Sequence, residues 1–303
     1  MTLTELQYIV ALAKTKHFGQ AAVACHVSQP TLSVAIKKLE STLGVAIFER
    51  HHNDIRITEI GKRIIHQAQR ALLEVSQIQE IATASQSHVH SPLKIGAIYT
   101  VAPYLFPTLI PAIKKRAPKM LLIIQEDFTE NLRIKLQNGE LDAIFVALPF
   151  TEPGIVKKTL YDEPFVVVMR KDHSLSTNKS ISKTDLTNEN ILLLGKSNCF
   201  REQVIKSCPR CYDANNNHQT MEGASLETLR HMVASGVGIT VLPSSATAIK
   251  YYNNILCVKP FKTNTPQRTI VLAWRAGFPR TKAIDAIIQS VSDCHLNGVC
   301  LIR

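Results

Sequence analysis

Residues 18–40 read FGQAAVACHVSQPTLSVAIKKLE, and two short helices separated by a tight break fit this stretch. The break falls at residues 25–28, and apolar residues follow helical spacing on both sides of it: Phe18, Ala21, Ala22, Val27, Leu32, Ile36 and Leu39. Ser28 is a good N-cap for the second helix, and Pro30 is tolerated in its first turn, where backbone N–H groups have no internal partner. This arrangement predicts a helix-turn-helix, the motif whose second helix lies in the major groove of DNA.

Polar residues occupy the outer face of the second predicted helix, namely Gln29, Thr31, Ser33, Lys37 and Lys38. Gln, Thr and Ser side chains can read base edges, and Lys can neutralise phosphates. The face therefore suits DNA. A plain three-helix packing unit produces much of the same pattern and is the alternative.

A long helix is predicted next, because residues 58–88 contain no Pro and a single Gly. Apolar residues in it are spaced four and three apart, as in a coiled-coil seam: Ile64, Ala68, Ala71, Val75, Ile78 and Ala82. Thr58 stands in front of the seam as a suitable N-cap. A helix of about 30 residues is roughly 45 Å long and cannot bury such a stripe alone. We expect a two-helix dimer seam, and packing against its own domain is the alternative.

From residue 91 onward, short apolar runs alternate with helical stretches. The runs predict buried strands at residues 93–99, 120–126, 141–147, 165–169, 191–195, 238–243 and 269–274. Helical patterns lie between them, at residues 103–116, 129–138 and 225–235. This alternation predicts an α/β domain with a mostly parallel sheet covered by helices.

The composition is that of a globular protein of 303 residues, long enough for two domains or for one small and one large domain. Apolar residues make up 45%, and every apolar run is far shorter than the ~18–20 residues that span a bilayer. No basic-then-apolar leader stands at the N-terminus, so we expect a cytoplasmic protein without a membrane partner. The net charge of +11 suits nucleic acid, although a basic cytosolic protein has the same balance.

The strings SQPTLSVAIKKLESTLGVAIFER (28–50) and ITEIGK (57–62) closely resemble the N-terminus of LysR-type transcriptional regulators. The resemblance implies a winged helix-turn-helix, a dimerising linker helix and an effector domain shaped like a periplasmic binding protein, with two α/β subdomains around a cleft. It places these parts at residues 1–58, 59–90 and 91–303, with subdomain I at 91–163 and 268–303 and subdomain II at 164–267.

The same resemblance implies how the chain meets its partners. It assigns Gln29, Pro30, Thr31 and Ser33 to the DNA-reading face of the recognition helix, and Arg50 to the DNA backbone near the wing. The implied partners are promoter DNA, RNA polymerase and further copies of the chain, in a homodimer or homotetramer.

Residues 195–211 read GKSNCFREQVIKSCPRC, and their chemistry centres on Cys199. An apolar strand and a Gly-Lys-Ser-Asn turn precede this cysteine, and FREQVIKS after it is typical of a short helix. Cys199 then lies at or near a helix N-terminus with Arg201 beside it, and both features stabilise a thiolate. We expect a reactive thiol, and an inert, half-buried thiol is the alternative.

Cys208 follows Cys199 after nine residues. Nine helical residues rise about 13.5 Å and make about 2.5 turns, so the two sulfurs face opposite sides. A disulfide needs Cα atoms within about 7 Å, so a bond between these cysteines requires the segment to unwind. Closing a loop of about ten residues biases the ensemble by roughly 2.5–3 kcal/mol, which suffices to switch two nearly balanced states.

The thiol pair resembles that of the LysR-type regulators that sense hydrogen peroxide. In those proteins peroxide oxidises the first cysteine to a sulfenic acid, and the second resolves it to a reversible disulfide. The resemblance extends to a peroxide pocket, to which it assigns Thr100, Thr129, His218, Asn198 and Arg201. Asn198 departs from the His that many of these regulators carry, and an Asn side chain can hydrogen-bond but cannot shuttle a proton.

The other cysteines of the seven have weaker patterns. Cys208 and Cys211 form a Cys-Pro-Arg-Cys motif, which by itself suits a thioredoxin-like pair or half of a zinc site. No second motif of this kind occurs, so Cys211 is kept as an alternative resolving thiol. We expect Cys25 in the core of the helix-turn-helix, and structural roles for Cys257, Cys294 and Cys300.

Three functions compete for this sequence. The first is a regulator of the oxidative-stress response that senses hydrogen peroxide through Cys199 and Cys208. The second is a LysR-type regulator that binds a small molecule in the interlobe cleft near Thr100 and Thr129. The third is a thiol peroxidase or dithiol oxidoreductase, against which the DNA-reading pattern argues, so we expect no enzyme. The sequence contains no nucleotide-binding loop, metal-ligand cluster or hydrolase triad, so no cofactor and no metal are expected.

Overall fold

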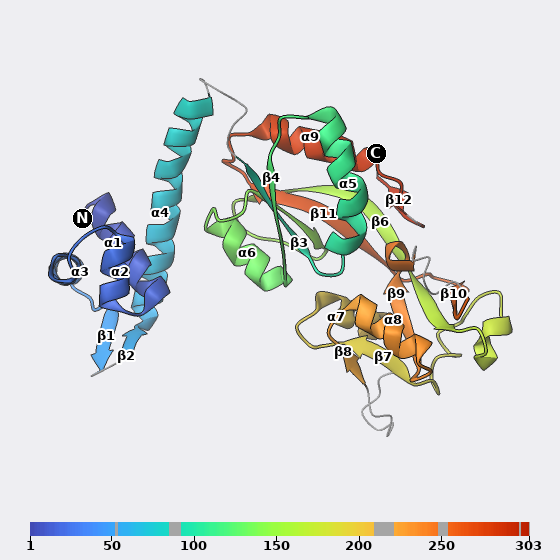
Figure 1. Cartoon of the computed structure of the whole chain (residues 1–303). Coiled ribbons are helices and arrows are strands. Elements are labelled where there is room, and N and C mark those ends of the chain that lie inside the picture. The colour runs from blue at the N-terminus through green and yellow to red at the C-terminus, as the bar shows by residue number, and fades with distance from the viewer. Residues whose placement is uncertain (52–53, 85–91, 209–220, 248–253, 297, 303) are drawn as a thin grey trace. The chain divides into compact units, whose positions relative to one another are not determined.

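The computed structural model describes residues 1–303 except 52–53, 85–91, 209–220, 248–253, 297 and 303. The chain forms two compact units (Figure 1). The N-terminal unit holds Met1–His88 with Gln137–Gly139, and the C-terminal unit holds Val89–Leu136 and Glu140–Arg303.

The N-terminal unit is a winged helix-turn-helix followed by a long helix. Its elements, in chain order, are α1 (Leu3–Thr15), α2 (Phe18–Ala24), α3 (Gln29–Leu43), β1 (Phe48–His51), β2 (Asp54–Ile57) and α4 (Glu59–Ala84). The predicted break between the two short helices is confirmed. The hydroxyl of Ser28 accepts from the backbone N–H of Thr31 at 3.3 Å, and Pro30 lies in the first turn of α3.

The strands β1 and β2 pair antiparallel and form the wing, with Phe48 opposite Ile57. The core of the unit consists of apolar residues at helical spacing on α1 to α3 together with the start of the wing: Leu6, Ile9, Leu12, Ala21, Ala22, Leu32, Ile36, Leu39 and Ile47. Because the apolar faces of α1, α2 and α3 pack together in this core, the start of α3 is left exposed at the surface.

Two roles were predicted for the apolar seam of α4, a dimer seam and packing against its own domain, and different parts of the helix bear on each. Its first part packs against the unit's own core, with Ala68 at 3% exposure and Ile64 and Ala71 partly buried there. Farther along the helix Ile78 is 66% exposed. The alternative of packing against its own domain is therefore right for the first three seam positions. The dimer seam stays a prediction for the later ones, and the side chain of Ala82 lies outside the described residues.

In the described residues, the C-terminal unit is built on a sheet of ten strands. Eight of them follow the spatial order β4-β3-β5-β11-β6-β9-β7-β8, while β10 and β12 pair with β6. Their bounds are β3 (Leu93–Ile98), β4 (Leu122–Asp127), β5 (Ala143–Ala147), β6 (Ile155–Arg170), β7 (Ile191–Leu194), β8 (Glu222–Gly223), β9 (Ile239–Pro243), β10 (Leu256–Pro260), β11 (Gln267–Arg275) and β12 (Cys300–Leu301).

The prediction of a mostly parallel sheet is wrong at the centre of the sheet. The pairs β3–β4, β3–β5, β7–β8 and β7–β9 are parallel, but β6 and β11 run antiparallel to each of their neighbours. The sequence indicated only the apolar end of β6, because its first half carries polar residues such as Lys157, Lys158 and Asp162. Up to Pro164 this strand pairs with β11, and from Phe165 it pairs with β9. The proposed subdomain boundaries stay a prediction.

Helices cover the sheet around two separate hydrophobic cores. The remaining helices are α5 (Ala102–Arg116), α6 (Thr129–Gln137), α7 (Cys199–Ser207), α8 (Leu226–Ala234) and α9 (Thr281–Ser292), with short 3-10 turns at Ser174–Thr177 and Ser244–Thr247. The first core contains β3, β5 and β11 with α5 and α9, which lie side by side (Figure 1). The second core contains β7 and β9 with α7 and α8. Within the described ranges, no helix combines the length and apolarity that crossing a membrane requires.

Candidate functional site

Cys199 is the first residue of α7, as the sequence predicts. The N-cap Asn198 makes no side-chain hydrogen bond to the helix, and its side chain is 9% exposed. The backbone N–H groups of the first turn and the positive end of the helix dipole therefore lie beside the half-buried Cys199 sulfur.

Thr129 meets this sulfur from a distant part of the chain. It is the first residue of α6, and its hydroxyl donates to Cys199 Sγ at 3.5 Å. Asp127 orders the start of α6, because one carboxylate oxygen accepts from the backbone N–H of Phe128 at 2.9 Å and from the side chain of Asn131 at 2.7 Å. The structure thus brings one of the predicted pocket residues, Thr129, to the predicted redox cysteine, Cys199.

Cys208 lies at the opposite end of the same helix. It is the C-cap of α7 and is 3% exposed within the second core, whereas Cys199 packs against the first core. The predicted helix between the two cysteines is confirmed. Its nine residues separate the sulfurs along the axis, so no disulfide can join them while α7 is intact.

Phe200 and Arg201, which lie between the cysteines, hold α7 in place. The Phe200 ring lies 5.0 Å from the Phe165 ring in an edge-on arrangement, and the guanidinium of Arg268 lies 5.0 Å above it. Arg201 donates to the carbonyl of Leu194 at 2.7 Å and pairs with Glu222 at 2.8 Å. These bonds direct the Arg201 guanidinium to β7 and β8, whereas the sequence assigned it to the peroxide pocket beside the sulfur.

Gln203 holds α7 from its other side and was missed by the sequence analysis. Its side-chain N–H donates to the carbonyl of Leu148 at 3.1 Å, which fixes the orientation of the amide. Its Oε1 is buried and has no hydrogen-bond partner among the described residues. Gln203 follows Cys199 by four residues, so both lie on one face of the helix. That spacing was the available signal that Gln203 shares a helix face with Cys199.

Thr100 is buried at 3% exposure, and its partner is an arginine that the sequence analysis did not select. Arg268 donates to the Thr100 hydroxyl and to the Thr100 carbonyl, each at 2.8 Å. Arg268 also forms an ion pair at 2.7 Å with Glu163, and both side chains are fully buried. Arg268 contacts Thr100 and the Phe200 ring at once, so it links the start of α7 to the end of β3. The paired strands β6 and β11 carry this ion pair.

Two predicted residues lie where the structure says nothing of them. His218, assigned to the peroxide pocket, and Cys211, the alternative resolving thiol, fall outside the described residues. Of the remaining thiols, Cys294 is buried, Cys25 and Cys257 are half-buried, and Cys300 is exposed. Burial raises the pKa of the Cys25, Cys257 and Cys294 thiols, which makes them poor nucleophiles. The described residues contain no group of side chains arranged to hold a metal ion.

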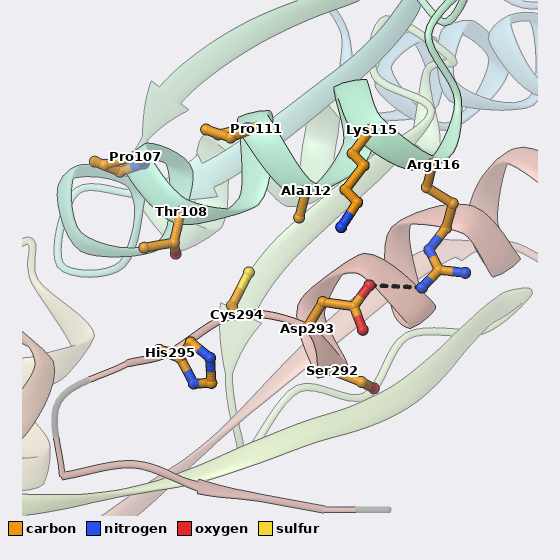
Figure 2. Close-up of a pocket in the computed structure, with 10 residues that line it drawn as sticks. All are labelled: Pro107, Thr108, Pro111, Ala112, Lys115, Arg116, Ser292, Asp293, Cys294 and His295. Atoms are coloured by element: carbon orange, nitrogen blue, oxygen red, sulfur yellow. Dashed lines mark hydrogen bonds and ion pairs between the residues drawn. The ribbon is translucent and has the colours of Figure 1, made fainter.

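A hollow of about 1120 Å³ lies between α5 and the end of α9 (Figure 2). An ion pair between Arg116 and Asp293 crosses it at 2.5 Å, and Cys294 points its sulfur toward α5. None of the residues predicted for the redox or ligand site lines it: its wall is Pro107, Thr108, Pro111, Ala112, Lys115, Arg116, Ser292, Asp293, Cys294 and His295. This hollow is therefore separate from the Cys199 site.

The predicted DNA-reading face is formed by the start of α3. Gln29, Pro30 and Thr31 are exposed there, as the sequence predicts. Ser33 is half-buried, because it follows the fully buried Leu32 and turns partly toward the core. Arg50 lies on the wing strand β1, but its side chain is outside the described residues.

Comparison with known proteins agrees with this architecture. The model of the bacterial regulatory helix-turn-helix protein, lysR family, matches residues 3–62, and the model of the LysR substrate binding domain matches residues 86–293. The chain belongs to the LysR family. The LysR-family relative OxyR of Escherichia coli, a DNA-binding transcriptional dual regulator, is 36% identical over 99% of this chain and 98% of its own length. A hydrogen peroxide-inducible genes activator of Dickeya chrysanthemi is 36% identical over 97% of this chain and 95% of its own.

Solved LysR-family structures resemble the whole chain. A full-length variant of OxyR from Pseudomonas aeruginosa has 49% sequence identity and a TM-score of 0.82, over 100% of this chain and 98% of its own. A hydrogen-peroxide-bound mutant of Corynebacterium glutamicum OxyR has 30% identity and a TM-score of 0.63, over 96% of this chain and 92% of its own. The predicted fold class, a winged helix-turn-helix with a LysR-type α/β effector domain, is confirmed.

Proposed function

We propose that this LysR-family chain is a transcription regulator that senses hydrogen peroxide through Cys199 and answers by forming a Cys199–Cys208 disulfide. One observation carries the proposal: the reactive cysteine stands at a helix N-terminus, receives a hydrogen bond from Thr129 at 3.5 Å, and shares that helix with a second cysteine. The relatives named for hydrogen-peroxide-inducible activation support it, because they match nearly the whole chain.

The first chemical step oxidises the Cys199 sulfur. The thiolate attacks one oxygen of hydrogen peroxide, an S–O bond forms, the O–O bond breaks, and the departing oxygen takes a proton and leaves as water. The helix N-terminus stabilises the attacking thiolate, and the Thr129 hydroxyl lies where it can hold the peroxide or donate to the departing oxygen. Asn198, Thr100 and His218 are proposed as the remaining wall of this pocket, and the Oε1 of Gln203 as a further acceptor.

The second step joins the two cysteines. The Cys208 thiolate attacks the sulfur of the Cys199 sulfenic acid, an S–S bond forms, the S–O bond breaks, and the departing hydroxide takes up a proton and leaves as the second water. Cys208 must first leave the second core, where it is 3% exposed, and the nine-residue helix must unwind to close a separation of about 13.5 Å. The same unwinding breaks the contacts that Phe200 and Gln203 make with Phe165 and Leu148.

Oxidation is proposed to change how the protein binds promoter DNA. Gln29, Pro30, Thr31, Ser33 and Arg50 are proposed to contact DNA, in a homodimer or homotetramer that also meets RNA polymerase. Rearrangement of α7 disturbs the second core, which contains α8, β7 and β9, and so reshapes the surfaces through which the copies assemble.

Mass spectrometry of peroxide-treated protein tests the redox step, and footprinting of promoter DNA with reduced and oxidised protein tests the output. We expect a Cys199–Cys208 disulfide at micromolar peroxide and a different footprint in the oxidised state. A Cys199 that stays reduced under these conditions contradicts the proposal.

The second candidate is a LysR-family regulator governed by a small molecule, which the match to the LysR substrate binding domain favours. The interlobe cleft near Thr100 and Thr129 is its proposed binding place. A Cys199→Ser variant separates the two functions, because a small-molecule sensor keeps its inducible response and a peroxide sensor loses it.

A further inference from the structure

Residues 46–48 connect the end of the recognition helix α3 to the wing, and their backbone is bound by side chains from two helices. On one side lies Glu40, near the end of α3. Its Oε1 accepts from the backbone N–H of Ile47 at 2.7 Å and from that of Phe48 at 3.0 Å. A carboxylate that accepts two backbone N–H groups makes a charge-assisted contact, stronger than a neutral hydrogen bond. The wing is therefore tied directly to the helix that faces DNA.

On the other side lies the start of α4. The hydroxyl of Thr58 donates to the carbonyl of Ala46 at 2.8 Å, and the Thr58 backbone N–H donates to the carbonyl of Ile47 at 3.1 Å. The same hydroxyl accepts from the backbone N–H of Gly61 at 2.8 Å, which caps α4. One threonine thus caps the long helix and binds it to the connecting segment.

Gly61 allows this close approach. A Cβ atom at that position would lie 2.2 Å from the carbonyl oxygen of Ile47, a distance that no real side chain shows. Ile47 is fully buried and Phe48 is 5% exposed, so the segment cannot move outward without exposing apolar surface. The first turn of α4 is consequently pressed against the backbone that leaves α3.

We infer that Glu40, Thr58 and Gly61 form a rigid joint that sets the angle between the recognition helix α3 and the linker helix α4. This inference rests on the proposed function, in which α3 reads DNA in a homodimer or homotetramer, and on the predicted dimer seam of α4. Helix-turn-helix dimers read two half-sites separated by about one helical turn of DNA, or a multiple of it, and the spacing follows from how the dimer carries its recognition helices. The three residues are positioning residues for half-site spacing.

Glu40→Ala in the full-length protein tests the joint. Binding is measured by fluorescence anisotropy on the DNA fragment that the wild-type protein protects, and on fragments with one and two base pairs inserted between the half-sites. The wild-type protein should bind the native spacing at least about tenfold more tightly than either insertion, since a misplaced recognition helix loses base contacts. Glu40→Ala should bring this ratio close to one while keeping salt-dependent binding to unrelated DNA.

Matched variants separate the joint from general effects. Glu40→Gln removes the same charge but retains an acceptor oxygen, so it should keep most of the spacing preference. Ser41→Ala alters an exposed neighbour on α3 and should behave as the wild-type protein. A loss of affinity that is equal at every spacing assigns Glu40 a role in stability alone and overturns the inference.

Hydrogen exchange shows whether the joint has opened without unfolding of the unit. The amides of Ile47 and Phe48 should exchange at least about tenfold faster in Glu40→Ala, since they lose a charged acceptor, while the amides inside α3 keep their protection. If α3 also loses protection in Glu40→Ala, the spacing measurement is repeated with Thr58→Val, and with Thr58→Ser as its conservative control. A Thr58→Val protein that keeps the wild-type ratio of affinities between native and altered spacing overturns the inference. A wild-type protein that shows no spacing preference contradicts the proposed function instead.

Discussion

Helix α3, proposed to read DNA, and helix α7, proposed to carry the redox switch, start differently, and the difference matches these proposed roles. The side chain of Ser28 caps α3, and Gly44 ends it in a left-handed conformation with φ of 69°. Asn198 makes no side-chain cap on α7, and Cys208 ends it without a glycine. Fifteen residues form α3 and nine form α7, and isolated helices shorter than about 12–15 residues are marginal in water.

Local caps therefore add to the core packing of α3, whereas the shorter α7 has no side-chain cap at its start and relies on tertiary contacts. Phe200 and Val204 are each 1% exposed, and Gln203 reaches the carbonyl of Leu148. A helix held in this way keeps its shape while the surrounding cores are intact, and it unwinds when a covalent bond outweighs those contacts. Its uncapped start also leaves backbone N–H groups near the Cys199 sulfur. A DNA-reading helix needs the opposite property, since its base contacts require one geometry.

The largest expected effect comes from Cys199→Ser, which removes from α7 the sulfur that is proposed to react with peroxide. We expect peroxide to cause no change in the DNA footprint of this variant, because no sulfenic acid and no Cys199–Cys208 bond can form. Footprinting with and without peroxide measures it, and Cys294→Ser is the matched control, since burial raises the pKa of the Cys294 thiol. A peroxide response that survives Cys199→Ser assigns sensing to another residue.

Gln203→Ala should weaken α7 in the reduced protein. The carbonyl of Leu148 loses its donor, and the loss of a hydrogen bond costs about 0.5–1.5 kcal/mol, so the helix should open about 2- to 10-fold more often. Amide hydrogen exchange across residues 199–208 without peroxide measures this opening. Glu202→Ala, at an exposed neighbouring position, should leave the exchange rates unchanged. Equal rates in both variants would show that tertiary contacts do not limit the opening of α7.

The helix starts themselves can be compared by replacing each N-cap. Ser28→Ala should destabilise the N-terminal unit by about 1 kcal/mol, because the first turn of α3 loses an acceptor. Asn198→Ala should leave the protection of α7 unchanged, because Asn198 makes no side-chain cap. Hydrogen exchange of the two helices gives both values. Equal losses of protection in the two variants would contradict the conclusion that a side chain caps α3 and none caps α7.

Thr129→Val should slow the reaction of Cys199. The sulfur loses the hydroxyl that donates to it, and a hydrogen bond is worth about 0.5–1.5 kcal/mol, which corresponds to a roughly two- to tenfold lower rate. The rate of alkylation of Cys199 measures this, with Thr129→Ser as the conservative variant that should restore most of it. A Thr129→Val protein with the wild-type rate removes Thr129 from the site.

The smallest expected effect is a pH dependence at the start of α6. Burial by itself raises the pKa of Asp127, but hydrogen bonds from Lys135, Asn131 and the Phe128 backbone outweigh it, so the pKa is lowered overall. A lowered carboxyl pKa stabilises the folded state fully above the ordinary value of about 3.9, and this contribution is lost as the pH falls through the lowered pKa. Acid titration of the α6 amides should show this loss, and Asp127→Asn should abolish it.

Most of the N-terminal unit could be predicted because its signals are local. The cap at Ser28, the proline beside it and the helical spacing of residues such as Leu32 and Ile36 act within a few residues of one another. The strand order of the C-terminal unit could not be predicted in the same way. The polar first half of β6 carries no strand pattern, and the antiparallel run of β6 beside β11 follows from contacts between segments about 100 residues apart.

The proposed redox site, too, was predictable only in the features that depend on neighbouring residues in the sequence. A cysteine pair at the two ends of a nine-residue helical pattern is visible in the sequence, because helix geometry depends on spacing alone. The sequence did not indicate Arg268 or Gln203, since their importance comes from Thr100, Phe200 and Leu148, which they meet only after folding.

The order of residues alone determined the helix-turn-helix, its cap, and the two cysteines that regular backbone holds apart, because each depends on periodicity or on neighbours within one or two turns. Tertiary structure decided which groups surround the Cys199 sulfur and which core encloses Cys208. Thr129 is 70 residues from Cys199 along the chain, and only the packing of α6 and α7 within one unit brings its hydroxyl to the sulfur.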